Sequence, residues 1–193
     1  GASHAAFLAA AAAETDGDKG PRALVELPGY EPHIRAPAAV GATVDRFRRT
    51  PEDDFELDPE RIEAAVSPET AFVTVTNRHN PTGALAGRET LADAADAAQS
   101  VDAHLLVDEV YAPYGSAPDD GRTAFGGPTA AGLDGAVVVN SLSKFHGLPD
   151  LRIGWLVADE AFAAQARAAK HYVPAVSDVT ERLAARAVHA AGA

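Results

Sequence analysis

The stretch Ala136-Val137-Val138-Val139-Asn140-Ser141-Leu142-Ser143-Lys144 runs from apolar, mostly β-branched residues into small polar side chains and one lysine. A short apolar run of this kind predicts a buried strand, with the serines and the lysine at its carboxyl end. Two other segments repeat the arrangement: 71–76 precedes Asn80-Pro81-Thr82-Gly83, and 104–107 precedes Asp108-Glu109-Val110-Tyr111. Open α/β sheets bind ligands beyond the carboxyl ends of their strands, so these polar residues are the candidate site.

Alanine-rich amphipathic stretches alternate with the apolar runs along the whole chain. We predict strands at 23–27, 43–47, 71–76, 104–107, 136–140 and 153–158. We predict helices at 2–14, 32–40, 59–66, 88–100, 160–171 and 178–190, with a break at Pro174. The alternation is typical of an α/β fold with a largely parallel sheet. A Gly- and Pro-rich loop over 115–132 is long enough to indicate a functional segment.

The charge balance of the chain is strongly acidic. Its 193 residues carry 28 acidic and 16 basic side chains, a formal net charge of -12, and only three of the basic residues are lysines. An acidic, alanine-rich, lysine-poor composition is similar to that of proteins from salt-loving organisms, and a high-GC genome is the alternative explanation. So negative a surface disfavours non-specific nucleic-acid binding and offers no polybasic patch to an anionic membrane.

Missing residue types exclude several kinds of chemistry. The chain has no cysteine, which excludes disulfides and thiolate catalysis, and its seven histidines lack metal-ligand spacing, so we expect no metal site. The apolar start at 5–13 has no basic leader and is interpreted as a helix, and no apolar run is long enough to span a bilayer. Because methionine is absent, we expect the chain to be a fragment that begins inside a larger protein.

Lys144 is the candidate reactive residue. It lies among small hydroxyls, and Arg152 follows eight residues later. That grouping suits a lysine that forms a Schiff base with an aldehyde cofactor while its neighbours hold a phosphate. A lysine after a buried strand is more often a solvated surface residue, so the interpretation depends on the other motifs.

Four motifs occur in one order along the chain: His79-Asn80-Pro81-Thr82-Gly83, Asp108-Glu109-Val110-Tyr111, Ser141-Leu142-Ser143-Lys144, and Gly147-Leu148-Pro149 with Arg152-Ile153-Gly154-Trp155. With them the chain resembles the large domain of fold-type I pyridoxal-phosphate enzymes, specifically the class I/II aminotransferases, over essentially its whole length. The resemblance implies a three-layer αβα sandwich with a mostly parallel sheet. It also implies that residues 1–193 form one incomplete cofactor-binding domain, with an N-terminal segment and a C-terminal small domain outside the chain.

The resemblance assigns roles around the cofactor ring. Lys144 would form the Schiff base and later move the substrate's proton. Asp108 would pair with the pyridine nitrogen, which keeps the ring protonated and able to accept electrons. Asn80 and Tyr111 would donate hydrogen bonds to the ring oxygen, and that lowers the pKa of the imine. Tyr30 would stack on the ring face.

The phosphate would be held from two sides. Gly1-Ala2-Ser3 resembles the family's phosphate loop, in which a helix begins and its free N–H groups bind the anion. Ser141, Ser143 and Arg152 would close the other side, since the planar guanidinium matches phosphate oxygens. Asp150 stands where the family commonly has glycine, and we expect its side chain to point outward. Three further motif residues are assigned to structure: His79, His146 and Trp155.

The resemblance implies a cytoplasmic, homodimeric aminotransferase that uses pyridoxal 5'-phosphate, an amino acid and a 2-oxo acid, with neither nucleic acid nor membrane as a partner. The arginine that binds the substrate carboxylate would lie outside this chain, so we expect the chain alone not to be a competent transaminase. Two alternatives stay open. One is another reaction on the same cofactor site, namely a carbon–sulfur lyase, a decarboxylase or a ring-forming synthase. The other is a non-enzymatic effector domain of a transcription regulator, which the acidic balance disfavours.

Overall fold

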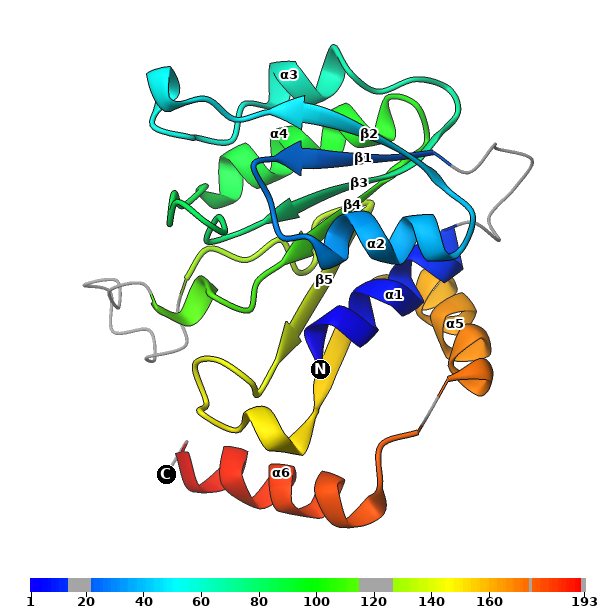
Figure 1. The fold of residues 1–193 in the computed structure, drawn as a ribbon, viewed down its shortest axis with the longest axis vertical. Helices are drawn as coiled ribbons and strands as arrows, with labels where there is room; N and C mark the ends of the chain where they lie inside the picture. Colours follow the sequence, from blue (N-terminus) through cyan, green and yellow to red (C-terminus); the bar gives the residue numbers. More distant parts are fainter. Residues whose placement is uncertain (14–21, 115–126, 174, 192–193) are drawn as a thin grey trace.

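A six-stranded sheet forms the centre of the molecule. The computed structural model (Figure 1) describes residues 1–13, 22–114, 127–173 and 175–191. Within them the strand order is β2-β1-β3-β4-β5-β6, in which only β6 runs antiparallel to its neighbour. The strands are β1 Arg22–Leu27, β2 Thr43–Arg48, β3 Thr70–Thr76, β4 His104–Asp108, β5 Ala136–Ser141 and β6 Gly154–Val157. The mostly parallel α/β sheet predicted from the sequence is therefore confirmed.

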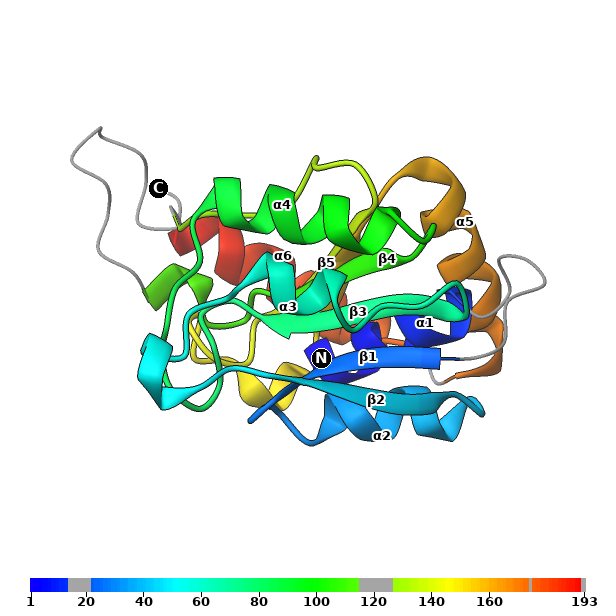
Figure 2. The same cartoon turned by 90° about the horizontal axis from the view of Figure 1, so that it is seen from above.

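Helices cover both faces of this sheet. The helices of the described residues are α1 Ala2–Ala13, α2 Pro32–Ala39, α3 Pro59–Glu63, α4 Arg88–Gln99, α5 Glu160–Ala169 and α6 Asp178–Ala191. The described residues also form the short 3-10 turns η1 Pro51–Asp53, η2 Ala112–Tyr114, η3 Pro149–Leu151 and η4 Lys170–Tyr172. Figure 2 shows α3 and α4 on one face of the sheet and α1 and α2 on the other, which is the predicted three-layer sandwich.

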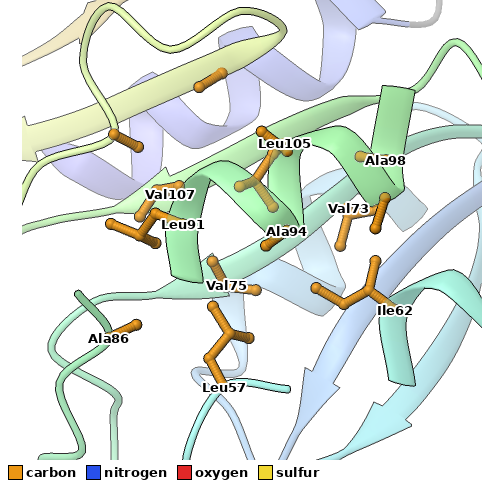
Figure 3. Close-up of a cluster of buried hydrophobic side chains, with 14 of the residues drawn as sticks. Leu57, Ile62, Val73, Val75, Ala86, Leu91, Ala94, Ala98, Leu105 and Val107 are labelled. Atoms are coloured by element: carbon orange, nitrogen blue, oxygen red, sulfur yellow. The ribbon is translucent and has the colours of Figure 1, made fainter. Parts of the chain in front are cut away.

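The larger core lies between α4 and the sheet (Figure 3). Leu91 and Ala94 of α4 pack with Val73 and Val75 of β3 and with Leu105 of β4, and all five are fully buried. Parallel strands buried on both faces appear in the sequence as continuous apolar runs, as they do here. Each fully buried valine or leucine contributes roughly 1.5–3 kcal/mol relative to an exposed one. This packing holds β3 and β4 against α4 and so fixes where their carboxyl ends lie relative to each other.

Helix α1 packs on the opposite face through alanines. Those at 5, 6, 9, 10, 12 and 13 are buried against the sheet, and their small side chains let the helix approach it closely. The first helical hydrogen bonds run from the N–H groups of His4 and Ala5 to the carbonyl of Gly1, at 3.0 and 3.1 Å. The amino end of α1 therefore lies at Gly1.

The structure differs from the sequence prediction mainly at helix ends. The helix predicted at 59–66 stops at Glu63, because Pro68 disfavours helical backbone at the residue before it and Thr70 Oγ1 accepts the Ser67 N–H at 2.9 Å. The helix predicted at 160–171 passes into the 3-10 turn η4 after Ala169. Pro174 and most of the loop predicted at 115–132 lie outside the described residues.

Candidate functional site

A pocket of ≈ 190 Å³ opens at the carboxyl edge of the sheet. Every predicted site residue except Gly1 lines it: Ala2, Ser3, Tyr30, Asn80, Asp108, Tyr111, Ser141, Ser143, Lys144 and Arg152. Three lining residues were not predicted: Thr76, Val110 and Pro149. The residues are spread from position 2 to position 152, and those that follow β3, β4 and β5 meet because parallel strands end at one edge.

A larger cavity of ≈ 330 Å³ lies between α1, β6 and α5 and shares Arg152 with the first. It contains Gly1 but neither Lys144 nor Asp108. We therefore place the candidate site in the smaller pocket, where the reactive groups converge.

Asp108 is held on the floor of the pocket by two hydrogen bonds. It ends β4, is buried, and accepts the N–H of Val110 on Oδ1 at 3.0 Å. Its Oδ2 lies 3.0 Å from Nε2 of His33, a buried residue of α2. Because an ionised carboxylate can only accept, His33 donates this bond and carries a proton on Nε2. His33 thus fixes the orientation of Asp108.

His33 is a residue that the sequence analysis missed. It lies three residues after Tyr30, and the two rings contact edge to face, with centroids 5.3 Å apart at 87°. The Tyr30 hydroxyl lies 3.4 Å from Ser3 Oγ, so the aromatic side chain spans from α2 to the start of α1. The loop that carries Tyr30 needs glycine at 29, because a Cβ there would lie 2.7 Å from the carbonyl oxygen of Glu26.

One end of the pocket is cationic. Arg152 follows η3 in left-handed backbone, with φ 52°, and its Nη1 donates to Pro149 O at 3.1 Å and approaches Ser143 Oγ at 3.5 Å. The Gly1 nitrogen donates to the Arg152 carbonyl at 2.7 Å. A Cβ on Gly154 would lie 2.5 Å from the backbone of Gly1, so these elements pack in direct contact. The amino end of α1 and a guanidinium favour an anion here.

Lys144 and Tyr111 form another part of the pocket lining. Lys144 is exposed in the turn after β5, and its Nζ lies 5.7 Å from the centroid of the Tyr111 ring, within cation–π range. Ser141 Oγ accepts the Ser143 N–H at 3.3 Å and so shapes the turn that presents the lysine. Asp150 is exposed, as predicted.

Asn80 lies in the turn between β3 and α4. The turn is fixed by Asn77, whose amide donates to Ala86 O at 3.1 Å and accepts from Ala86 N at 2.9 Å.

Glu109 follows Asp108 in the sequence, and burial raises the pKa of its carboxyl group. Hydrogen bonds from Ala130 N and Thr129 Oγ1, each 2.7 Å, partly oppose this effect.

The arrangement can hold a flat, ionisable ring with an anionic group at one end.

Within the described residues, no helix is long and apolar enough to cross a bilayer. The same residues contain no group of three or more His, Asp or Glu side chains placed to bind a metal ion.

Comparisons with known proteins agree with this geometry. The family model described as aminotransferase class I and II matches residues 1–192. Arginine–pyruvate transaminase of Pseudomonas aeruginosa is 29% identical over 145 residues, which are 75% of this chain and 36% of that protein. Threonine-phosphate decarboxylase of Salmonella typhimurium is 31% identical over 153 residues, 79% of this chain and 40% of that one.

A solved structure of an aspartate aminotransferase mutant from Thermus thermophilus superposes with a TM-score of 0.73 at 27% identity, covering 89% of this chain and 45% of that one. The chain thus spans less than half the length of these proteins.

Proposed function

This chain belongs to the aminotransferase class I and II family, and from that premise we propose that it carries the cofactor site of a pyridoxal-phosphate-dependent aminotransferase. The enzyme would transfer an amino group from an amino acid to a 2-oxo acid. The observation that carries the proposal is the convergence of Lys144, Asp108 and Arg152 on one pocket. These three supply an amine, a buried carboxylate and an anion-binding cation.

The residues of the pocket fit pyridoxal phosphate. The Asp108 carboxylate, which already accepts hydrogen bonds from Val110 and His33, has lone pairs to spare for a protonated ring nitrogen. The phosphate would be held by the backbone of Gly1, Ala2 and Ser3 at the amino end of α1, and from the other side by Ser141, Ser143 and Arg152. Tyr30 is 37% exposed and lines the pocket, so its ring can cover the cofactor. When bound, the cofactor supplies an electrophilic carbonyl and a ring that accepts electrons.

The chain's own groups then have separate tasks. Asp108, oriented by His33, would keep a proton on the ring nitrogen. Asn80 and Tyr111 would donate to the ring oxygen. Lys144 would anchor the cofactor through its Nζ and, once substrate has displaced it, carry the proton that leaves the substrate Cα.

The same proposal covers the assembly and the cellular location of the protein. We expect residues 1–193 to be the large domain of a homodimeric, cytoplasmic protein, with the substrate-carboxylate site completed by sequence outside this chain. The net charge of -12 supports work at high salt, where a carboxylate-rich surface stays hydrated. Light scattering across a salt titration would measure both assembly and solubility.

A decarboxylase is the second candidate, because a relative with 31% identity is a threonine-phosphate decarboxylase. Half-reactions separate the two. An aminotransferase converts an amino acid to its oxo acid without releasing CO2, and a second oxo acid then restores the starting absorption spectrum. A decarboxylase releases CO2 from the amino acid, and an effector domain changes neither compound. Measured on the intact protein, absence of oxo-acid formation with every amino acid of a panel would contradict the aminotransferase proposal.

A further inference from the structure

A second buried carboxylate, Glu26, lies one layer behind the pocket. It is 1% exposed, it is the penultimate residue of β1, and it does not itself line the pocket. Its Oε1 accepts two hydrogen bonds from Thr76, from the backbone N–H at 2.7 Å and from Oγ1 at 2.6 Å. Thr76 ends β3 and lines the pocket. Glu26 therefore holds a residue of the pocket wall directly.

The other carboxylate oxygen binds Arg49, which is also buried. Arg49 Nη1 donates to Oε2 of Glu26 at 2.8 Å, and its Nε donates to the carbonyl of Phe55 at 2.8 Å. The Arg49 N–H donates to the carbonyl of Leu27 at 2.9 Å. The pair thus ties the chain after β2 to the chain after β1.

His79 extends the network to the turn that carries Asn80. Its Nε2 lies 3.7 Å from Glu26 Oε2 and 3.0 Å from the carbonyl of Pro28. Since that carbonyl can only accept, Nε2 carries the proton, and Nδ1 accepts from Thr82 Oγ1 at 2.6 Å. Burial lowers the pKa of His79, which favours this neutral form. His79 therefore joins the Asn80 turn to the loop 28–30.

A buried ion pair is weak evidence for a role in stability, because apolar residues of similar volume often stabilise as well or better. The pair does fix the positions of backbone segments. It connects the carboxyl ends of β1, β2 and β3, and the loops after β1 and β3 carry Tyr30 and Asn80. We infer that Glu26 is a positioning residue of the cofactor site, which holds Tyr30, Thr76 and Asn80 in register through Thr76, Arg49 and His79. This inference rests on the proposed function.

Glu26→Gln is the direct test, since it keeps the shape but sets an amide donor against Arg49. We expect the dissociation constant of pyridoxal phosphate to rise about tenfold, as for the loss of one hydrogen bond to a charged group. Misplacing Asn80 also weakens the donor to the ring oxygen. We therefore expect the pH midpoint of the bound cofactor's visible absorption band to rise by about one unit.

Two further variants separate positioning from stability. Val73→Ala, on the same strand as Thr76 but in the α4 core, should lower the unfolding temperature without moving the midpoint. Arg49→Lys, which keeps the charge but loses the bond to Phe55, should move the midpoint in the same direction by less. Should Glu26→Gln fail to fold, Arg49→Lys alone decides the question.

A cofactor-free measurement completes the test. Amide hydrogen exchange in segments 27–30 and 77–84 should accelerate together in Glu26→Gln and Arg49→Lys but not selectively in Val73→Ala. Unchanged exchange, or a midpoint that Val73→Ala moves as far as Glu26→Gln does, would overturn the inference. If the wild type binds no pyridoxal phosphate, the proposed function fails, and the exchange data still show whether Glu26 holds the loops. If the wild type shows a normal cofactor band and Glu26→Gln leaves its pH midpoint unchanged, the positioning role of Glu26 is refuted, and the proposed function still stands.

Discussion

The hydrogen bond between His33 and Asp108 gives the most quantitative prediction. Both side chains are buried, and Nε2 lies 3.0 Å from Oδ2. His33→Phe removes the donor but keeps the aromatic edge that contacts Tyr30. A hydrogen bond to a charged group contributes roughly 1.5–3 kcal/mol.

The loss in the free energy of unfolding is partly offset by a second effect of the same substitution. Among the described residues, His33 Nδ1 has no hydrogen-bond partner, so phenylalanine also removes a buried, unpaired nitrogen. Removing this unpaired nitrogen raises the free energy of unfolding by about 1 kcal/mol. We therefore expect His33→Phe to lower the free energy of unfolding by about 0.5–2 kcal/mol, which for a domain of this size is about 1–8 °C in the unfolding temperature.

A double-mutant cycle checks that the loss belongs to this contact. Urea unfolding of the wild type, His33→Phe, Asp108→Ala and the double variant should give a coupling energy of about 1–2 kcal/mol. His33→Gln, which retains a side-chain donor, serves as the matched control and should lose less. Additive single-variant effects within about 0.5 kcal/mol would refute the reasoning, because the two side chains would then act independently.

Three other perturbations follow from single contacts. Gly29→Ala would place a Cβ 2.7 Å from Glu26 O and should weaken pyridoxal-phosphate binding, whereas Gly87→Ala, with nothing within 4 Å, should bind normally in the same fluorescence titration. Leu91→Ala should cost about 2–5 kcal/mol in chemical unfolding by leaving a cavity under α4, whereas Leu85→Ala at an exposed position should cost far less. Because burial raises the folded-state pKa of Glu109, wild-type stability should fall relative to Glu109→Gln as pH rises from the unfolded value of about 4.3 through the folded one. A pH-independent difference between those two proteins in thermal unfolding would contradict that assignment.

The sequence predicted the frame of the site well because its signals are local. Each strand prediction agrees with the structure to within one residue at either end, since runs rich in β-branched residues are bounded by turn residues here. The polar residues after β3, β4 and β5 were expected to meet because parallel strands share an edge, and they do line one pocket.

Interactions between distant residues were not predictable in the same way. His33 and Asp108 are 75 positions apart, and Glu26 and Thr76 are 50 apart, so neither pair leaves a local pattern. One signal was present: Glu26 is a charged residue inside the apolar run 23–27, where a parallel strand is buried on both faces. Such a residue needs a buried partner, and Arg49 supplies it, but the sequence does not say which arginine will.

Covalent trapping of the cofactor on Lys144 tests the central claim most directly. The protein is mixed with equimolar pyridoxal phosphate, reduced with borohydride, digested, and mapped by mass spectrometry. The chain has only two other lysines, Lys19 and Lys170, and these act as internal controls. We predict near-stoichiometric pyridoxyl label on Lys144 and its loss in Lys144→Arg. Equal labelling of Lys170, or undiminished labelling of Lys144→Arg, would contradict the account.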